Sequence, residues 1–169
     1  MHQRIRAIAL DVDGVLTDGS FLWGPDGQEF KRFHFLDVMG IARARRSGLT
    51  FALISGEESG LVGRFASKLG IDDVHTGCKD KASALRSFAE RHAFDLAHVC
   101  FMGDDVNDLP AMALAGFSAA PANAHSTVRA VASVVTERMG GNGAVRELLD
   151  HLVAQGLVTI SYESTPTER

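Results

Sequence analysis

Short apolar runs and helical patterns alternate along this chain. Runs of the length of a buried strand occupy residues 5–10, 49–54 and 99–102, with shorter ones at 117–120 and 131–135. Apolar residues recur at helical spacing in the stretches 37–47, 59–69, 80–91, 107–114, 126–132 and 144–155. Strands rich in Val, Ile, Leu and Ala that alternate with helices are typical of a parallel sheet covered on both faces. We therefore predict an α/β fold with a Rossmann-like parallel sheet.

One aromatic segment interrupts the alternation. Residues 20–23 and 30–35 flank a Gly-Pro-Asp-Gly sequence at 24–27, which is favourable turn chemistry. We predict a β-hairpin over residues 20–35, inserted after the first strand. An isolated hairpin is marginal in water, so this one should pack against the body or another subunit through its large aromatic side chains, Trp23, Phe30, Phe33 and Phe35.

The length of 169 residues fits one compact domain that can bury a core without disulfides or metals. We place this domain at residues 1–157 and expect no second one. A Gly-Gly-Asn-Gly run at residues 140–143 predicts a mobile loop before the last helix. The polar end at residues 161–169 predicts a disordered tail, which we place at residues 158–169.

Charge and hydropathy exclude several classes of partner. The formal net charge is -4, and Lys and Arg are scattered, which leaves no basic footprint for nucleic acid or an anionic membrane. No apolar stretch reaches the roughly 20 residues of a membrane span, and the N-terminus lacks the apolar region of a signal peptide. We expect a cytoplasmic protein whose partners are small molecules or other protein chains.

Acidic side chains follow two of the predicted strands. Asp11 and Asp13 come directly after the first strand, and the third is followed by Asp104, Asp105 and Asp108. The carboxyl ends of parallel strands meet at one edge of the sheet, where such folds bind ligands. Several carboxylates brought together are costly unless a cation neutralises them. An all-oxygen set without Cys or His indicates Mg²⁺, which can be shared between carboxylates and a phosphate.

Two further residues fit the same chemistry. Ser55 and Gly56 follow the second predicted strand, and Lys81 begins a predicted helix. Alone, Ser55 is an ordinary helix cap and Lys81 a solvated charge. Together with the acids, in one chain order, they favour a phosphoryl-transfer site in which Ser55 and Lys81 supply hydrogen bonds and positive charge.

Four motifs follow one another along the chain: DVDGVLTDG at residues 11–19, a Ser-Gly pair, a Lys and GDDVND at residues 103–108. Their order resembles that of the haloacid dehalogenase superfamily of phosphatases. The resemblance covers residues 5–149. It implies that Asp11 is a nucleophile that forms an aspartyl-phosphate. It also implies that Asp13 is the general acid and base, which in addition lends its backbone carbonyl to Mg²⁺.

The same resemblance assigns the other residues of the predicted site. Ser55 would bind the phosphoryl oxygens and Lys81 would balance charge on nucleophile and phosphate. Asp104 would complete the metal ligands with Asp11 and Asp13, while Asp105 and Asp108 would be supporting acids.

A narrower resemblance follows from the absence of room for a cap domain. The capless layout, the hairpin and the GGNGAVRE sequence at residues 140–147 resemble the 3-deoxy-D-manno-octulosonate 8-phosphate phosphatases. Members of that group are tetramers in which neighbouring subunits complete the cap. The resemblance therefore implies a homotetramer, with the hairpin in its interface and the loop at 140–143, followed by Arg146, helping to close the active site.

The chain departs from this group after Ser55. Octulosonate phosphatases typically have Thr-Gly-Arg where this chain has Ser55, Gly56 and Glu57, and an acid at that place resembles the related 2-keto-3-deoxynononate 9-phosphate phosphatases. Replacing Arg by Glu should disfavour a sugar acid whose carboxylate faces it. Arg64 and Lys68 are nearby substitutes for the basic residue usual in the following helix. We therefore place the nononate substrate slightly ahead of octulosonate, although Glu57 can also be a favourable first-turn acid.

Three alternative functions can be weighed against this interpretation. A capless site could belong to a broad small-molecule phosphatase. A domain of the same fold could only tetramerise, but such a domain should have lost catalytic positions that are all present here. A two-component receiver would not need Asp13 or the GDDVND loop.

Overall fold

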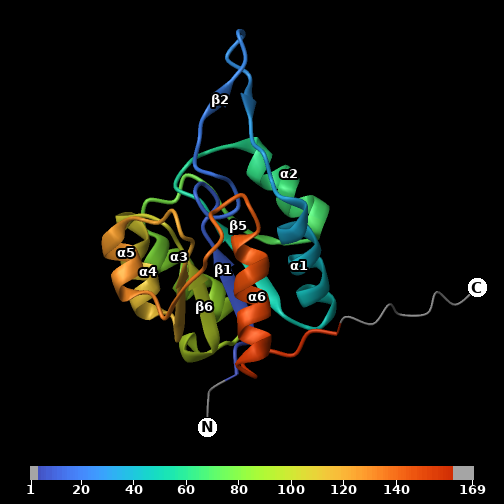
Figure 1. Ribbon diagram of the computed structural model, residues 1–169, viewed down its shortest axis with the longest axis vertical. Helices are drawn as coiled ribbons and strands as arrows, with labels where there is room; N and C mark the ends of the chain where they lie inside the picture. The colour runs from blue at the N-terminus through green and yellow to red at the C-terminus, as the bar shows by residue number, and fades with distance from the viewer. Residues whose placement is uncertain (1–3, 162–169) are drawn as a thin grey trace, which may run out of the picture.

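A six-stranded parallel sheet forms the centre of the protein, which a computed structural model describes over residues 4–161 (Figure 1). The sheet order is β5-β4-β1-β6-β7-β8. Its strands are β1 (Ala7–Leu10), β4 (Thr50–Ile54), β5 (Asp73–His75), β6 (Val99–Met102), β7 (Phe117–Ala120) and β8 (Val134–Val135). β1 is central and pairs in parallel with β4 and β6. The predicted α/β fold is confirmed.

Helices cover both faces of the sheet, as predicted. One face carries α1 (Phe35–Arg46), α2 (Gly60–Leu69) and α6 (Ala144–Ala154), and the other carries α3 (Lys81–Arg91), α4 (Leu109–Leu114) and α5 (Ser126–Val131). Successive strand residues point to opposite faces, so Ile8 and Leu10 join one core while Ala7 and Ala9 join the other. Two short 3-10 helices, η1 (Leu96–His98) and η2 (Val106–Asp108), precede β6 and α4.

The predicted hairpin projects from the end of the body, with β2 (Leu22–Trp23) antiparallel to β3 (Glu29–Phe30) (Figure 1). Its aromatic residues have different surroundings. Trp23 is 65% exposed, whereas Phe33 stacks on Phe65 with ring centroids 3.9 Å apart at the edge of the core. Phe35 is the first residue of α1 and not part of the hairpin.

The glycine loop at 140–143 packs against the loop that follows β1. The Gly140 N–H donates to Asn123 Oδ1 at 2.6 Å, and the Gly141 N–H donates to the carbonyl of Val15 at 3.1 Å. A Cβ at Gly140 would lie 1.9 Å from the carbonyl oxygen of Gly14, so only glycine allows this approach. The mobility of the loop stays a prediction, and its contacts place it beside the Asp11 and Asp13 segment.

Two predicted boundaries are wrong. Val158 and Ile160 are buried in the core, so the folded part extends beyond residue 157, and the rest of the predicted tail, 162–169, lies outside the described residues. The strand expected over 131–135 is shorter, because Val131 ends α5. Within residues 4–161, no helix combines the length and the apolar character that crossing a membrane requires.

Candidate active site

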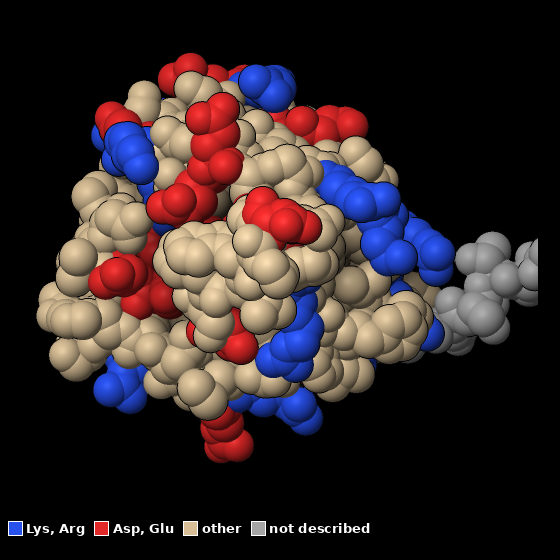
Figure 2. Space-filling model, turned by 90° about the horizontal axis from the view of Figure 1, so that it is seen from above, with Lys and Arg blue, Asp and Glu red and all other residues tan. Residues whose placement is uncertain are grey.

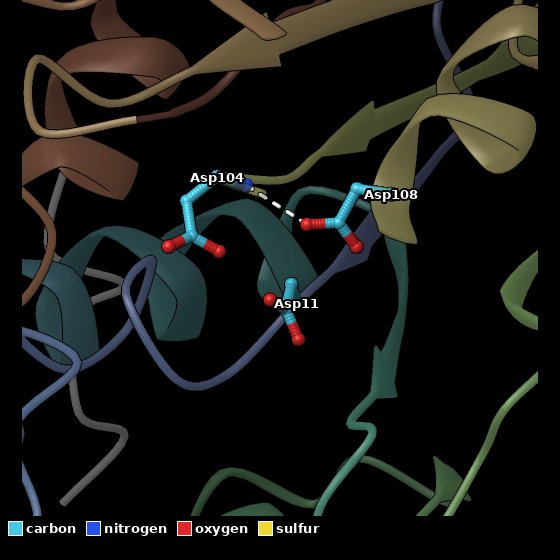
Figure 3. Close-up of side chains that lie close together, drawn as sticks. All are labelled: Asp11, Asp104 and Asp108. Carbon is cyan, nitrogen blue, oxygen red and sulfur yellow. Dashed lines mark hydrogen bonds between the residues drawn. The ribbon is translucent and has the colours of Figure 1, made fainter. Parts of the chain in front are cut away.

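Three carboxylates converge at the carboxyl end of the sheet (Figure 3). Asp11 follows β1, Asp104 follows β6, and Asp108 ends η2. One oxygen of each lies within 4.8 Å of the others. The parallel pairing of β1 and β6 causes this convergence, since both strands deliver their next residues to the same edge.

Lys81, the first residue of α3, lies between two of these acids. Its Nζ is 2.9 Å from Asp11 Oδ1 and 2.6 Å from Asp108 Oδ1, and its side chain is only 2% exposed. The side chain of Asp80 accepts the Ser83 N–H and so caps the helix that presents Lys81. The predicted pairing of Lys81 with the acids is therefore present as a buried ion-pair network.

Asp108 orders the loop that carries Asp104. Its Oδ2 accepts the backbone N–H of Asp104 at 2.9 Å and that of Asp105 at 3.2 Å. The Asp105 side chain in turn caps η2 and accepts the Val106 N–H at 2.7 Å. Both acids thus orient the loop, and their function as supporting acids of the metal site stays a prediction.

The electrostatics of this cluster favour an added cation. Burial, followed by repulsion from Asp108, raises the pKa of Asp11 well above its ordinary value, although Lys81 opposes the shift. Burial is also the main cause that raises the pKa of Asp104 to about 6. Burial by itself would lower the pKa of Lys81, but the charges of Asp11 and Asp108 outweigh it and raise this pKa. Three carboxylates therefore share one ammonium, and negative charge is left over.

The donor atoms fit a hard divalent cation. The cluster offers carboxylate oxygens alone, which are the ligands Mg²⁺ prefers. Asp13 Oδ2 is buried and has no hydrogen-bond partner among the described residues. Gly14 keeps the space in front of Asp104 open, because a Cβ there would lie 2.0 Å from Asp104 Oδ2. The residues present are thus suited to hold Mg²⁺.

Asp13 has a partner that sequence reasoning missed. Its Oδ1 lies 2.5 Å from Nζ of Lys31, which follows β3 of the hairpin. A lysine beside a hairpin is normally solvated, so nothing in the sequence indicated that this one is buried. Ser55 is also buried, and its Oγ accepts the Glu57 N–H at 3.2 Å within its own turn.

A cavity of about 230 Å³ opens over these groups. It is lined by Asp11, Asp13, Gly19, Phe21, Gly56, Glu57, Lys81, Asp104, Asp105 and Asn107. Gly56 and Glu57 were predicted to bind substrate, whereas Gly19, Phe21 and Asn107 were not. A larger hollow of about 810 Å³ lies around Arg4, Arg6 and His98, at the amino-terminal ends of the strands, and none of the site acids lines it.

The three predicted basic substrate ligands do not line this cavity. Lys68 lies with Arg45 and Arg46 around a separate hollow of about 300 Å³, and Arg64 is exposed on α2. Arg146 directs its Nε to Asp150 at 3.0 Å. Seen from the hairpin end, the largest basic group lies on the side of α1 and α2, apart from the acidic side chains beside the hairpin (Figure 2).

Comparison with known proteins gives consistent matches. A family model described as haloacid dehalogenase-like hydrolase matches residues 64–148. The chain is 40% identical over 155 residues to the 3-deoxy-D-manno-octulosonate 8-phosphate phosphatase KdsC of Escherichia coli K12, covering 91% of this chain and 82% of the relative.

Solved structures of such phosphatases have the same fold. One is the Moraxella catarrhalis enzyme in complex with magnesium, phosphate and KDO, with a TM-score of 0.86, 37% identity, and coverage of 89% of this chain and 86% of that chain. Another is the cobalt-bound enzyme of Haemophilus influenzae, with a TM-score of 0.86, 35% identity, and coverage of 90% of each chain.

Proposed function

The chain belongs to the haloacid dehalogenase-like hydrolases, among the capless 3-deoxy-D-manno-octulosonate 8-phosphate phosphatases, and from this premise we propose that it hydrolyses the phosphate monoester of a 2-keto-3-deoxy sugar acid. The observation that carries the proposal is the contact of Lys81 with both Asp11 and Asp108, beside the oxygen of Asp104. The site combines a carboxylate that can attack phosphorus with a fixed ammonium group. A cation can offset both the remaining negative charge of the acids and the charge of a phosphate ester.

Asp11 is the nucleophile in this proposal. Its carboxylate attacks the phosphorus, so that an Asp11–phosphorus bond forms while the bond from phosphorus to the sugar oxygen breaks. Lys81, 2.9 Å from Asp11 Oδ1, keeps positive charge at the point where the phosphoryl group arrives. The Ser55 hydroxyl, next to the cavity residue Gly56, can turn from its own loop to a phosphoryl oxygen.

Asp13 is the acid and base. It lines the same cavity as Asp11 and gives its proton to the leaving sugar oxygen. In the second step it takes a proton from water, whose oxygen attacks the phosphorus of the aspartyl-phosphate and releases Asp11 and inorganic phosphate. Dividing the reaction this way lets one carboxylate attack while another moves the protons.

Asp11, Asp104 and the backbone carbonyl of Asp13 would hold Mg²⁺, with Asp105 and Asp108 in support. When bound, the ion would supply the positive charge that neutralises these acids and polarises the phosphoryl oxygens. The magnesium of the Moraxella catarrhalis enzyme, which is similar to this chain, supports this assignment.

We also propose that the protein is a homotetramer whose hairpin forms part of the interface. Phe21, Leu22 and Trp23 are each more than half exposed, which is unusual for adjacent large apolar residues. The site of one chain is open, and Arg64, Lys68 and Arg146 lie outside its cavity. A neighbouring copy is therefore needed if these basic residues are to contact the substrate carboxylate.

Two substrates of the proposed class compete. The activity of the octulosonate phosphatases to which the chain is similar supports octulosonate 8-phosphate. The position of Glu57 in the cavity wall supports nononate 9-phosphate, because a carboxylate there repels a sugar carboxylate and accepts hydrogen bonds from a longer polyol. We expect the nononate to be slightly preferred.

The substrate assignment is tested by kcat/KM on octulosonate 8-phosphate, nononate 9-phosphate, N-acetylneuraminate 9-phosphate and simple sugar phosphates. Glu57→Arg should raise the ratio of kcat/KM for octulosonate 8-phosphate to kcat/KM for nononate 9-phosphate by about tenfold, equivalent to about 1.4 kcal/mol. The matched control is Glu58→Arg, since Glu58 is exposed beside Glu57 and does not line the cavity. An unchanged preference in Glu57→Arg would remove Glu57 from substrate selection. Similar rates on every ester would indicate a broad phosphatase.

A further inference from the structure

Lys31 differs from the rest of the hairpin to which it is attached. Its side chain is 3% exposed, whereas Leu22 and Phe30, which pair across the hairpin, are 60% and 44% exposed as residues. An ammonium withdrawn from water needs charged partners. Lys31 has two, Asp13 Oδ1 at 2.5 Å and Glu29 Oε1 at 3.2 Å.

Glu29 extends this contact to a third segment. Its second oxygen, Oε2, accepts the hydroxyl of Ser59 at 2.8 Å. Ser59 is also the N-cap of α2, where its Oγ accepts the Leu61 N–H. A continuous polar chain therefore runs from the loop after β1, through the hairpin, to the beginning of α2.

The two oxygens of Asp13 have unequal surroundings. Oδ1 is held by Lys31, while Oδ2 is buried and has no hydrogen-bond partner in the described part of the chain. A carboxylate fixed at one oxygen keeps a single orientation, and its other oxygen stays available for a proton. Proton transfer to a leaving group depends strongly on such orientation.

We propose that Lys31 is a positioning residue for Asp13, holding Oδ1 so that Oδ2 meets the leaving oxygen and then the attacking water. The inference rests on the proposed function of Asp13 as acid and base. It also gives the hairpin a second function, because Lys31 and Glu29 connect its base to the site. Movement of the hairpin would then change the geometry of proton transfer as well as the covering of the cavity.

A double-mutant cycle tests this inference on the best substrate of the panel. Lys31→Met removes the charge and retains much of the length, and we expect kcat to fall by about 10- to 100-fold with KM changed less than about threefold. Lys31→Arg should recover most of the loss. Asp13→Asn with Lys31→Met should be no slower than Asp13→Asn alone, because Lys31 acts through Asp13. Lys31→Gln replaces Lys31→Met if the latter does not fold, as judged by its melting temperature.

The control variant is Arg86→Met, which removes an exposed cation on α3 that does not line the cavity and should lose less than about threefold in kcat. An unchanged kcat in Lys31→Met, a rise confined to KM, or additive losses in the double variant would each overturn the inference. So would a loss in Arg86→Met as large as that in Lys31→Met. Full activity in Asp13→Asn would instead overturn the proposed function of Asp13 itself.

Discussion

The acid cluster around Asp11 and the hairpin formed by β2 and β3 lie at the same end of the sheet, but their side chains have opposite surroundings (Figure 1). In the cluster, Lys81 and Asp108 are almost fully buried and bind each other. In the hairpin, Leu22 and Trp23 are 60% and 65% exposed. One region buries charge, and the other exposes apolar surface.

The difference indicates which parts of the site one chain can complete alone. Lys81 pairs with Asp11 and Asp108 within the chain, and the negative charge that remains is suited to a metal ion. Exposed aromatic surface is not stabilised within the chain, which supports the proposed contact with a neighbouring copy. In this proposal the chemistry belongs to the single chain, while enclosure of the site depends on assembly. Lys31 is the residue that connects the two regions.

Asp11→Asn should have the largest effect and acts on the cluster alone. We expect kcat to fall by on the order of 10⁴- to 10⁶-fold, because the attacking carboxylate is lost. Thermal unfolding without metal should show no loss of stability, since Asp108 still pairs with Lys81 and one repulsive charge has gone. Quenched samples should contain no covalent phosphate by mass spectrometry.

Asp26→Asn, in the exposed hairpin turn, is the control for this loss of a carboxylate and should keep full activity. Substantial turnover in Asp11→Asn would exclude the covalent route.

Changing Leu22 and Trp23 to Ser should act on the hairpin alone. We expect light scattering to show that the tetramer dissociates at concentrations where the parent protein is assembled. Each Trp removed from the interface should cost about 2 kcal/mol or more in the free energy of association. Activity on sugar acid phosphates should fall with it, while p-nitrophenyl phosphate, which needs little enclosure, should be affected less.

Val131→Ser is the matched control, because Val131 is 59% exposed on α5, away from the hairpin. It should leave the assembly unchanged. A tetramer that persists in the hairpin variant would place the interface elsewhere.

Magnesium should give the smallest effect, a rise of several degrees in melting temperature that depends on pH. The pKa of Asp104 is raised from 3.8 to about 6, so a proton bound to Asp104 stabilises the folded state. This stabilisation is fully present below the ordinary pKa of 3.8. That stability is lost as the pH rises through about 6, where Mg²⁺ can replace the proton. The rise should therefore be larger at about pH 7.5 than at about pH 5.

Asp104→Asn should remove most of the magnesium-dependent rise at both pH values, and Asp26→Asn should leave it intact. An undiminished rise in Asp104→Asn would place the metal elsewhere.

Local pattern was sufficient to predict most of the fold. Buried parallel strands are continuous apolar runs, and covering helices repeat every three to four residues, so both can be read without knowing their neighbours. The convergence of Asp11 and Asp104 followed from the rule that parallel strands deliver their ends to one edge, whereas the contact of Lys81 with the nucleophile was implied by the family resemblance. Glu57 lines the cavity, and its contact with substrate stays a prediction.

The substrate contact predicted for Arg146 stays a prediction, because its Nε contacts Asp150 one helical turn away and it does not line the cavity of its own chain. The end of the folded part depends on packing against distant segments, and there the prediction was wrong. The chain was expected to lose its fold after residue 157, but Val158 and Ile160 are buried with the first core.

The sequence by itself determined the parallel α/β sheet, the acids at its carboxyl edge and the phosphatase chemistry that those acids support. Each of these depends on periodicity or on the order of motifs, which are local properties of the chain. Only the tertiary structure decided that Lys31 reaches Asp13, that the 140–143 loop packs on Gly14, and that Arg64 and Lys68 lie outside the cavity. These contacts join residues far apart in the chain, and packing selects them through distances and burial that no local pattern encodes.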